Sequence, residues 1–69
     1  MMEDKQIAEI IFVYRRRKRI NQSELAKAAN VSRNYISMIE RGKIENVSLR
    51  VLINIFSALD LTIEIKEIK

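Results

Sequence analysis

The sequence predicts a compact all-α domain of four or five helices, followed by a C-terminal β-strand that pairs across a dimer. The first observation is composition: the 69 residues include one Gly and no Pro, and 48% are hydrophobic. Such a chain favours helices over a turn-rich β fold. Secondly, apolar residues recur at three- and four-residue spacing, as in amphipathic helices. Thirdly, apolar and polar residues alternate after Asp60, which is typical of a strand. At this length we expect residues 1–69 to form a single domain.

Composition also limits the classes of function. The chain has no Cys and no His, so it lacks a disulfide framework, thiolate metal ligands and the commonest acid–base side chain. Its carboxylates are spread along the chain rather than clustered. We therefore expect no enzyme activity, no metal and no cofactor. The net charge of +4 favours a polyanionic partner, although an ordinary basic surface gives the same value.

The chain shows no sign of membrane insertion or export. No apolar run approaches the roughly 18 residues that a membrane-spanning helix needs. The N-terminal sequence MMEDKQ does not resemble a signal peptide. We expect a cytoplasmic, nucleoid-associated protein without a membrane partner.

The first helix is predicted from about Glu3 to Lys18. Its acids lie near its start and its bases near its end, which matches the helix dipole. Phe12 falls almost opposite the predicted apolar stripe, so it is either simply exposed or in contact with a partner. The predicted buried stripe consists of Ile7, Ile10, Ile11 and Tyr14.

Residues 22–41 predict two short helices joined by a tight turn. Asn21 and Glu24 have the spacing of a capping box and begin the first helix, about residues 22–29. Asn30 tolerates the left-handed conformation that a sharp turn requires. Ser32 caps the next helix, which runs to about residue 41, and Gly42 ends it.

The two faces of the second short helix differ in chemistry. Tyr35, Ile36 and Ile39 share one face and are expected to pack inward. The opposite face is mostly polar and free of acids, so it suits the major groove of a DNA duplex. We expect Arg33 and Asn34 to read bases directly, and Ser37 and Met38 to contact thymine methyls or sugar edges. Arg41 also belongs to this face.

One set of residues at fixed spacing carries a family resemblance. The set comprises Arg15, Gln22, Glu24, Leu25, Ala26, Val31, Ser32, Ile36, Ile39, Glu40, Gly42 and Lys43. It resembles the helix-turn-helix family of phage Cro and repressor proteins, also called the xenobiotic-response-element (XRE) family, from about Ile7 to Leu59. The resemblance implies a phage-repressor fold that binds double-stranded DNA. The alternative is an unrelated helical hairpin with incidental basic residues.

The resemblance also implies roles for individual residues. Arg15 and Glu40 match a structural ion pair, and Gln22 matches a glutamine that donates to a DNA phosphate. Helix N-termini favour phosphate through their free N–H groups and dipole, which agrees with this role. Arg19 stands where the family usually has Gly, so the loop before Ile20 can differ. The expected phosphate contacts are Arg19, Asn21, Gln22, Arg41 and Lys43.

The fourth helix is predicted from about Leu49 to Leu59, with Ser48 as its cap. Residues 46–49 resemble the N-P-S-L sequence of the family, with Val in place of Pro. Apolar residues surround this helix except at a narrow polar face, so it needs cover on more than one side. A second subunit would supply the additional cover. Asp60 then replaces the Gly that is common in the family.

The tail predicts a strand from Thr62 to Ile68, but no second strand is visible in the chain. Because one strand cannot satisfy its own backbone groups, we expect it to pair with the same strand of another copy. The stretch SALDLTIEIKE is similar to the HipB-like antitoxin subgroup of the family. The expected dimer contacts are Val51, Ile55, Ile63, Ile65 and Ile68.

Three functions follow from these observations. The leading one is a homodimeric, sequence-specific repressor that binds a palindromic operator. The second is an antitoxin that also binds a toxin protein and regulates its own operon. The third is a protein-interaction module that has lost DNA binding, against which Arg33, Asn34 and Arg41 on the outer face argue.

Overall fold

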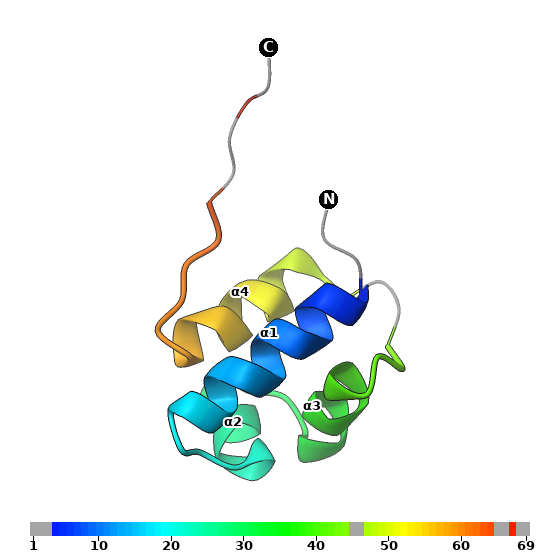
Figure 1. Cartoon of the computed structure of the whole chain (residues 1–69), viewed down its shortest axis with the longest axis vertical. Coiled ribbons are helices and arrows are strands. Elements are labelled where there is room, and N and C mark those ends of the chain that lie inside the picture. Colours follow the sequence, from blue (N-terminus) through cyan, green and yellow to red (C-terminus); the bar gives the residue numbers. More distant parts are fainter. Residues whose placement is uncertain (1–3, 45–46, 65–66, 68–69) are drawn as a thin grey trace.

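The structure, a computed structural model, describes residues 4–44, 47–64 and 67, which form an all-α fold. Figure 1 shows α1 crossing one side of the molecule, with α2 and α3 at one end and α4 behind it. α2 packs against both α3 and α4, and α1 packs against α3. The described residues contain no fifth helix. The helices are α1 (Asp4–Arg17), α2 (Gln22–Ala29), α3 (Arg33–Glu40) and α4 (Leu49–Ala58), so the predicted ends are confirmed to within one residue.

The hydrophobic core lies where all four helices meet. Its largest fully buried side chains are one from each helix: Ile11, Leu25, Ile36 and Ile55. Ala26 is also buried, and its small side chain allows α3 to lie close to α2. The orientation of α3 is therefore set by packing against the rest of the domain.

Local sequence signals define the helix ends as predicted. The Glu24 N–H donates to Asn21 Oδ1 at 2.7 Å, and the Asn21 N–H donates to Glu24 Oε1 at 2.9 Å, so the capping box is complete. Ser32 Oγ accepts from the Tyr35 N–H at 3.0 Å at the start of α3. Ser48 Oγ accepts from the Val51 N–H at 3.2 Å at the start of α4. These bonds satisfy N–H groups that a helix start leaves without intrahelical partners.

The turn between α2 and α3 depends on one left-handed residue. Asn30 adopts φ 59° and ψ 45°, and the Val31 N–H donates back to the Ala26 carbonyl at 2.9 Å. This bond closes the end of α2 and lets α3 begin after only three residues. Gly42 adopts φ 68° after α3, as predicted for the residue that ends it.

The buried side of α1 is broader than the predicted stripe. Ile11 is fully buried, and Ile7, Ile10 and Tyr14 are half-buried against the core, as predicted, but Ala8 and Arg15 are buried as well. The stripe was predicted from apolar residues alone. The inward Arg15 side chain turns the buried side of the helix toward α3. Phe12 consequently lies at the edge of this contact and remains 44% exposed.

The described tail, residues 61–64 and 67, forms no strand in this single chain. Leu61 and Ile63 are half-buried against the core, while Thr62 and Glu64 are exposed, so burial follows the predicted alternation. The Leu61 N–H donates to the Phe56 carbonyl at 2.8 Å, which fixes the start of the tail to α4. Pairing of this segment with a second copy stays a prediction.

Candidate nucleic-acid interface

The start of α3 presents the residues that we expect to read bases. Ile36 and Ile39 are buried and hold one face of the helix against the core. Arg33 and Asn34 are exposed on the first turn, and Ser37 and Met38 are half-buried one turn later. All four predicted base-reading residues thus belong to one helix, whose inner face is anchored.

The Asn34 side chain has a contact within α3. Its Nδ2 donates to Met38 Sδ at 3.5 Å, across one helical turn. An amide carries a second N–H and an acceptor oxygen, so this contact leaves both available. A bidentate contact with adenine needs one donor and one acceptor, and Asn34 can still supply them.

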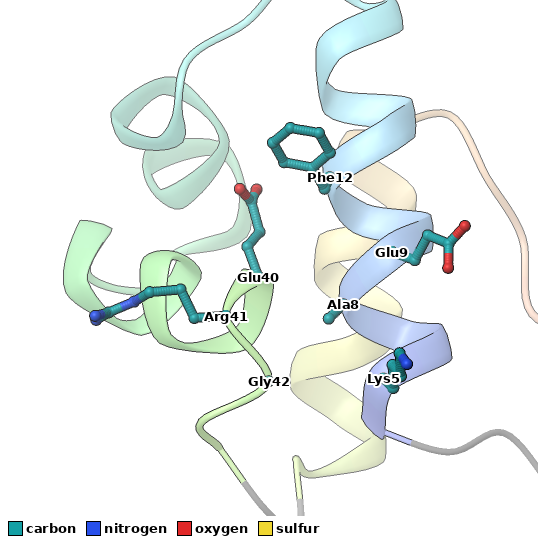
Figure 2. A pocket seen from close by; sticks show the side chains of 7 residues that line it. All are labelled: Lys5, Ala8, Glu9, Phe12, Glu40, Arg41 and Gly42. Carbon is teal, nitrogen blue, oxygen red and sulfur yellow. The ribbon is translucent and has the colours of Figure 1, made fainter.

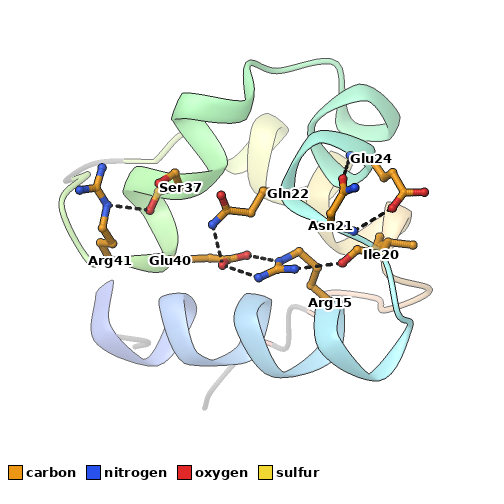
Figure 3. A network of polar contacts seen from close by, with 8 residues as sticks. All are labelled: Arg15, Ile20, Asn21, Gln22, Glu24, Ser37, Glu40 and Arg41. Carbon is orange, nitrogen blue, oxygen red and sulfur yellow. Dashed lines mark hydrogen bonds and ion pairs between the residues drawn. The ribbon is translucent and has the colours of Figure 1, made fainter.

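A buried ion pair joins α1 to α3 (Figure 3). Arg15 Nε donates to Glu40 Oε2 at 2.6 Å, and Arg15 Nη2 donates to Glu40 Oε1 at 3.0 Å. Arg15 Nη1 also donates to the Ile20 carbonyl at 2.9 Å, which ties down the loop before α2. The two charged side chains are only 9% and 4% exposed. The buried Arg15–Glu40 pair therefore joins the last turn of α1 to the last residue of α3.

Gln22 extends this network to the first residue of α2. Its Nε2 donates to Glu40 Oε1 at 3.1 Å, so the same carboxylate connects α1, α2 and α3 (Figure 3). The amide has a second N–H that this bond does not use. Gln22 can therefore brace α3 and donate to a phosphate at the same time.

The expected phosphate contacts lie at two places. Asn21 and Gln22 lie at the start of α2, where Asn21 uses Oδ1 as the helix cap and keeps its Nδ2 donor. Arg19 borders the same hollow as Asn21. Arg41 and Lys43 follow the end of α3 and are exposed there. Arg41 Nε donates to the Ser37 carbonyl at 3.4 Å, so its side chain lies back along α3 (Figure 3).

Backbone donors after α3 are already used within the chain. The Gly42 N–H donates to the Ile39 carbonyl at 2.9 Å, and the Lys43 N–H donates to the Met38 carbonyl at 2.8 Å. The sequence predicts a phosphate contact from Lys43, which either its backbone N–H or its side chain could make. These two N–H groups end the helix instead, so the Lys43 ammonium is the group left to meet a phosphate there.

The predicted dimer contacts on α4 need a correction at Ile55. Its side chain is fully buried in the core of its own chain, so it cannot touch a second subunit. Val51 and Ile63 are half-buried, and Ile65 and Ile68 lie outside the described residues. Leu49 and Ile53 are instead 52% and 46% exposed, one turn apart on α4. Sequence reasoning noted their apolar character but did not select them.

Comparison with known families decides the classification. The sequence profile described as helix-turn-helix matches residues 13–66, well over half of the chain. The chain belongs to the helix-turn-helix family. The match is to the Cro and repressor type, also called the XRE type, whose members are DNA-binding transcription regulators. A comparison with curated proteins finds no match.

The helix-turn-helix match covers the elements that carry the interface. It begins in the C-terminal part of α1 and includes α2, α3 and α4, and thus every predicted base-reading and phosphate-contacting residue. Within residues 4–44, 47–64 and 67, no group of acidic side chains is placed to hold a metal ion. No helix in this part of the chain is both long and apolar enough to cross a membrane.

Proposed function

We propose that this helix-turn-helix protein is a transcriptional repressor that binds a palindromic operator as a homodimer. The observation that carries the proposal is the outer face of α3. Arg33 and Asn34 are exposed at its start, while Ile36 and Ile39 anchor the other face. The single acid of the helix, Glu40, is turned inward to Arg15. A rigid, acid-free helix surface of this kind fits the major groove, where base edges are distinguishable.

Cationic and amide groups on either side of α3 support the same proposal. Asn21 and Gln22 lie at the start of α2, and Arg41 and Lys43 follow the end of α3. Contacts to phosphate fix the register and orientation of a protein on the duplex, while base contacts give specificity. Asn21 and Gln22 on one side of α3, and Arg41 and Lys43 on the other, would hold this helix in the major groove. A protein that acts in this way works at the nucleoid, in the cytoplasm.

The homodimer is supported by apolar surface near the C-terminus. Leu49 and Ile53 expose apolar side chains on α4. In the tail, half-buried Leu61 and Ile63 alternate with exposed residues. Antiparallel pairing of residues 62–68 across a two-fold axis would extend this surface and make the interface self-complementary. Two recognition helices would then lie about 34 Å apart, one DNA turn, and require a palindromic site.

An antitoxin role is the second candidate. The exposed pair Leu49 and Ile53 and the alternating tail could contact a toxin protein as well as a second copy. DNA binding would then serve autoregulation. A kinase-like gene directly downstream, and a stable complex between the two products, would establish this role.

The deciding experiment is selection of bound sequences from a random DNA pool by the full chain. We expect enrichment of an inverted repeat whose half-sites are centred about 10 base pairs apart. Sedimentation of the protein with the selected duplex should give two chains per site. Failure to enrich any sequence, together with no salt-dependent binding to duplex DNA, would contradict the proposal and favour an interaction module.

A further inference from the structure

Phe12 is an exposed aromatic residue beside the candidate DNA interface. Its side chain is 44% exposed at the edge of the contact between α1 and α3. It lines an open groove with Ala8, Arg41 and Gly42, and Figure 2 shows the ring on the side of α1 that faces these residues. Core packing does not account for a large apolar side chain in this position. A role at the surface is the alternative.

Two guanidinium groups lie over the Phe12 ring. The Cζ atoms of Arg15 and Arg16 are each 5.6 Å from the ring centroid, within the range of cation–π attraction. Arg15 is immobilised by Glu40 and the Ile20 carbonyl. Arg16 is exposed and forms no ion pair among the described residues. The ring therefore has a fixed cation as one neighbour and holds the other, Arg16, at the surface.

The Phe12–Arg16 pair lies between the two expected phosphate-binding regions. Arg16 borders the hollow at the start of α2 that Arg19 and Asn21 also line. Phe12 shares its groove with Arg41 and Gly42, at the end of α3. We expect a duplex that touches both regions to pass close to this part of α1.

Three carboxylates lie near this position. Glu9 lines the same groove as Phe12, and Figure 2 shows its carboxylate directed away from the Phe12 ring. Glu24 borders the hollow beside Arg16, and its Oε1 accepts the Asn21 N–H. Glu40 is paired with Arg15. Arg16 lies between the two regions and forms no ion pair among the described residues.

We propose that Arg16 is a further phosphate contact and that Phe12 is a positioning residue that holds its guanidinium toward the DNA backbone. This inference rests on the proposed DNA-binding function. An arginine held on an aromatic face loses less side-chain freedom when it pairs with a phosphate, and its planar fork can donate two parallel bonds. The pair would extend the phosphate contacts from α2 and α3 onto α1.

The test compares the salt dependence of binding among variants of the full chain. The probe is the duplex selected from the random pool, with a scrambled duplex of equal length alongside. Arg16→Ala should lower the slope of log K against log salt by about 0.9 per subunit on both duplexes. Phe12→Ala and Phe12→Leu should weaken binding about two- to fivefold per subunit and lower the slope by part of that amount. Phe12→Tyr should restore parental values, because it keeps the ring.

Two controls separate positioning from general effects of charge and packing. Arg17→Ala removes the same charge from a neighbouring position, where the Arg17 Cζ lies 5.0 Å from the Tyr14 ring centroid on another side of α1. It should leave the slope nearly unchanged. The double variant Phe12→Ala with Arg16→Ala should match Arg16→Ala alone, because the ring acts through Arg16. Thermal melts should place all Phe12 variants close to the parent protein.

The outcomes distinguish this inference from the proposed function. A parent protein without salt-dependent DNA binding overturns both. Normal binding by the parent with an unchanged slope in Arg16→Ala overturns the phosphate contact alone. A full loss in Arg16→Ala with parental binding by Phe12→Leu, or additive effects in the double variant, overturns the positioning role of Phe12.

Discussion

Arg15 and Gln22 donate to the same carboxylate oxygen of Glu40, at 3.0 and 3.1 Å. One comes from α1 and the other from the first turn of α2, while the acceptor lies at the end of α3. The ion pair that stabilises the fold therefore also orients Gln22, a residue expected to touch DNA. Removal of this carboxylate should therefore lower both the stability of the fold and the affinity for DNA.

The first prediction concerns Glu40→Ala. It leaves Arg15 buried without a counter-ion, which should cost about 3–5 kcal/mol of unfolding free energy. Joint replacement of Arg15 by Met and Glu40 by Leu should cost less, because no unpaired charge remains. Urea denaturation measures both, with Glu9→Ala on the exposed side of α1 as the control. If Glu40→Ala has the same urea midpoint as Glu9→Ala, the ion pair contributes little to the free energy of unfolding.

The second prediction concerns base reading by Arg33. An exposed arginine on the first turn of α3 can bridge O6 and N7 of guanine. Arg33→Ala should cost about 1–3 kcal/mol on the selected operator and relax preference at one base pair in each half-site. Changing that base pair should then leave the affinity of the Arg33→Ala variant almost unchanged. Full affinity together with an unchanged selected sequence would rule this assignment out.

The third prediction concerns Lys43 as a phosphate contact. Its N–H is engaged by the Met38 carbonyl, so only its ammonium can reach DNA. Lys43→Ala should weaken binding to every sequence alike and lower the salt slope by about one unit per contact. Lys27→Ala, in the last turn of α2, removes equal charge and should change the slope little. Loss of discrimination at a single base pair would instead identify Lys43 as a base reader.

Interactions between residues close in sequence made the helix-turn-helix predictable from the sequence. The Asn21–Glu24 capping box, the left-handed Asn30 and the Ser32 cap each act within a few residues. Each could therefore be inferred from its immediate neighbours. The bounds of α2 and α3 followed from these signals.

Long-range contacts limited the remaining predictions. The buried side of α1 includes Arg15, which meets Glu40 25 residues away in sequence; the family resemblance implied this pair, but the apolar periodicity of α1 alone could not indicate it. On α4, apolar residues surround most of the helix, so periodicity could not distinguish fully buried Ile55 from exposed Ile53. Phe12 was recognised as exposed, but its groove and its two arginine neighbours required the packed structure.

The fourth prediction concerns backbone strain at Arg19. Arg19 and Asp60 adopt φ of 59° and 60°, a left-handed conformation that glycine adopts without steric cost. Arg19→Gly should raise stability by about 0.5–1 kcal/mol, since relief of about 1–2 kcal/mol of strain exceeds the added chain entropy. Asp60→Gly should be nearly neutral, because Asp tolerates this conformation and its exposed ion pair with Lys18 is lost. Thermal melts that rank the two variants in the opposite order would refute this account.

Arg19→Gly should also separate stability from DNA binding. Arg19 borders the hollow at the start of α2 and is an expected phosphate contact. The variant should therefore melt higher while its salt slope falls by about 0.9 per subunit. A higher melting temperature with an unchanged slope would confine Arg19 to a structural role.

The last prediction concerns the dimer. Leu49 and Ile53 are exposed on α4, and Ile55, fully buried, is excluded from any contact between subunits. Ile53→Lys places a charge in this surface and should dissociate the dimer at micromolar concentration, because an unpaired charge resists burial. Asn54→Lys, next to it on the exposed polar face, adds the same charge and should leave the dimer intact.

Truncation after Leu61 tests the strand separately, since the Leu61 N–H still caps α4 and the helical body is kept. If α4 and the tail both hold the dimer, each variant should be monomeric in solution. Each variant should then bind the palindromic duplex with a Hill coefficient above one. Sedimentation equilibrium and operator titration measure the two effects. If Ile53→Lys stays dimeric while the truncated chain does not, the tail alone joins the subunits. If both stay dimeric with parental affinity, neither α4 nor the tail forms the interface, and the operator symmetry must arise from another surface.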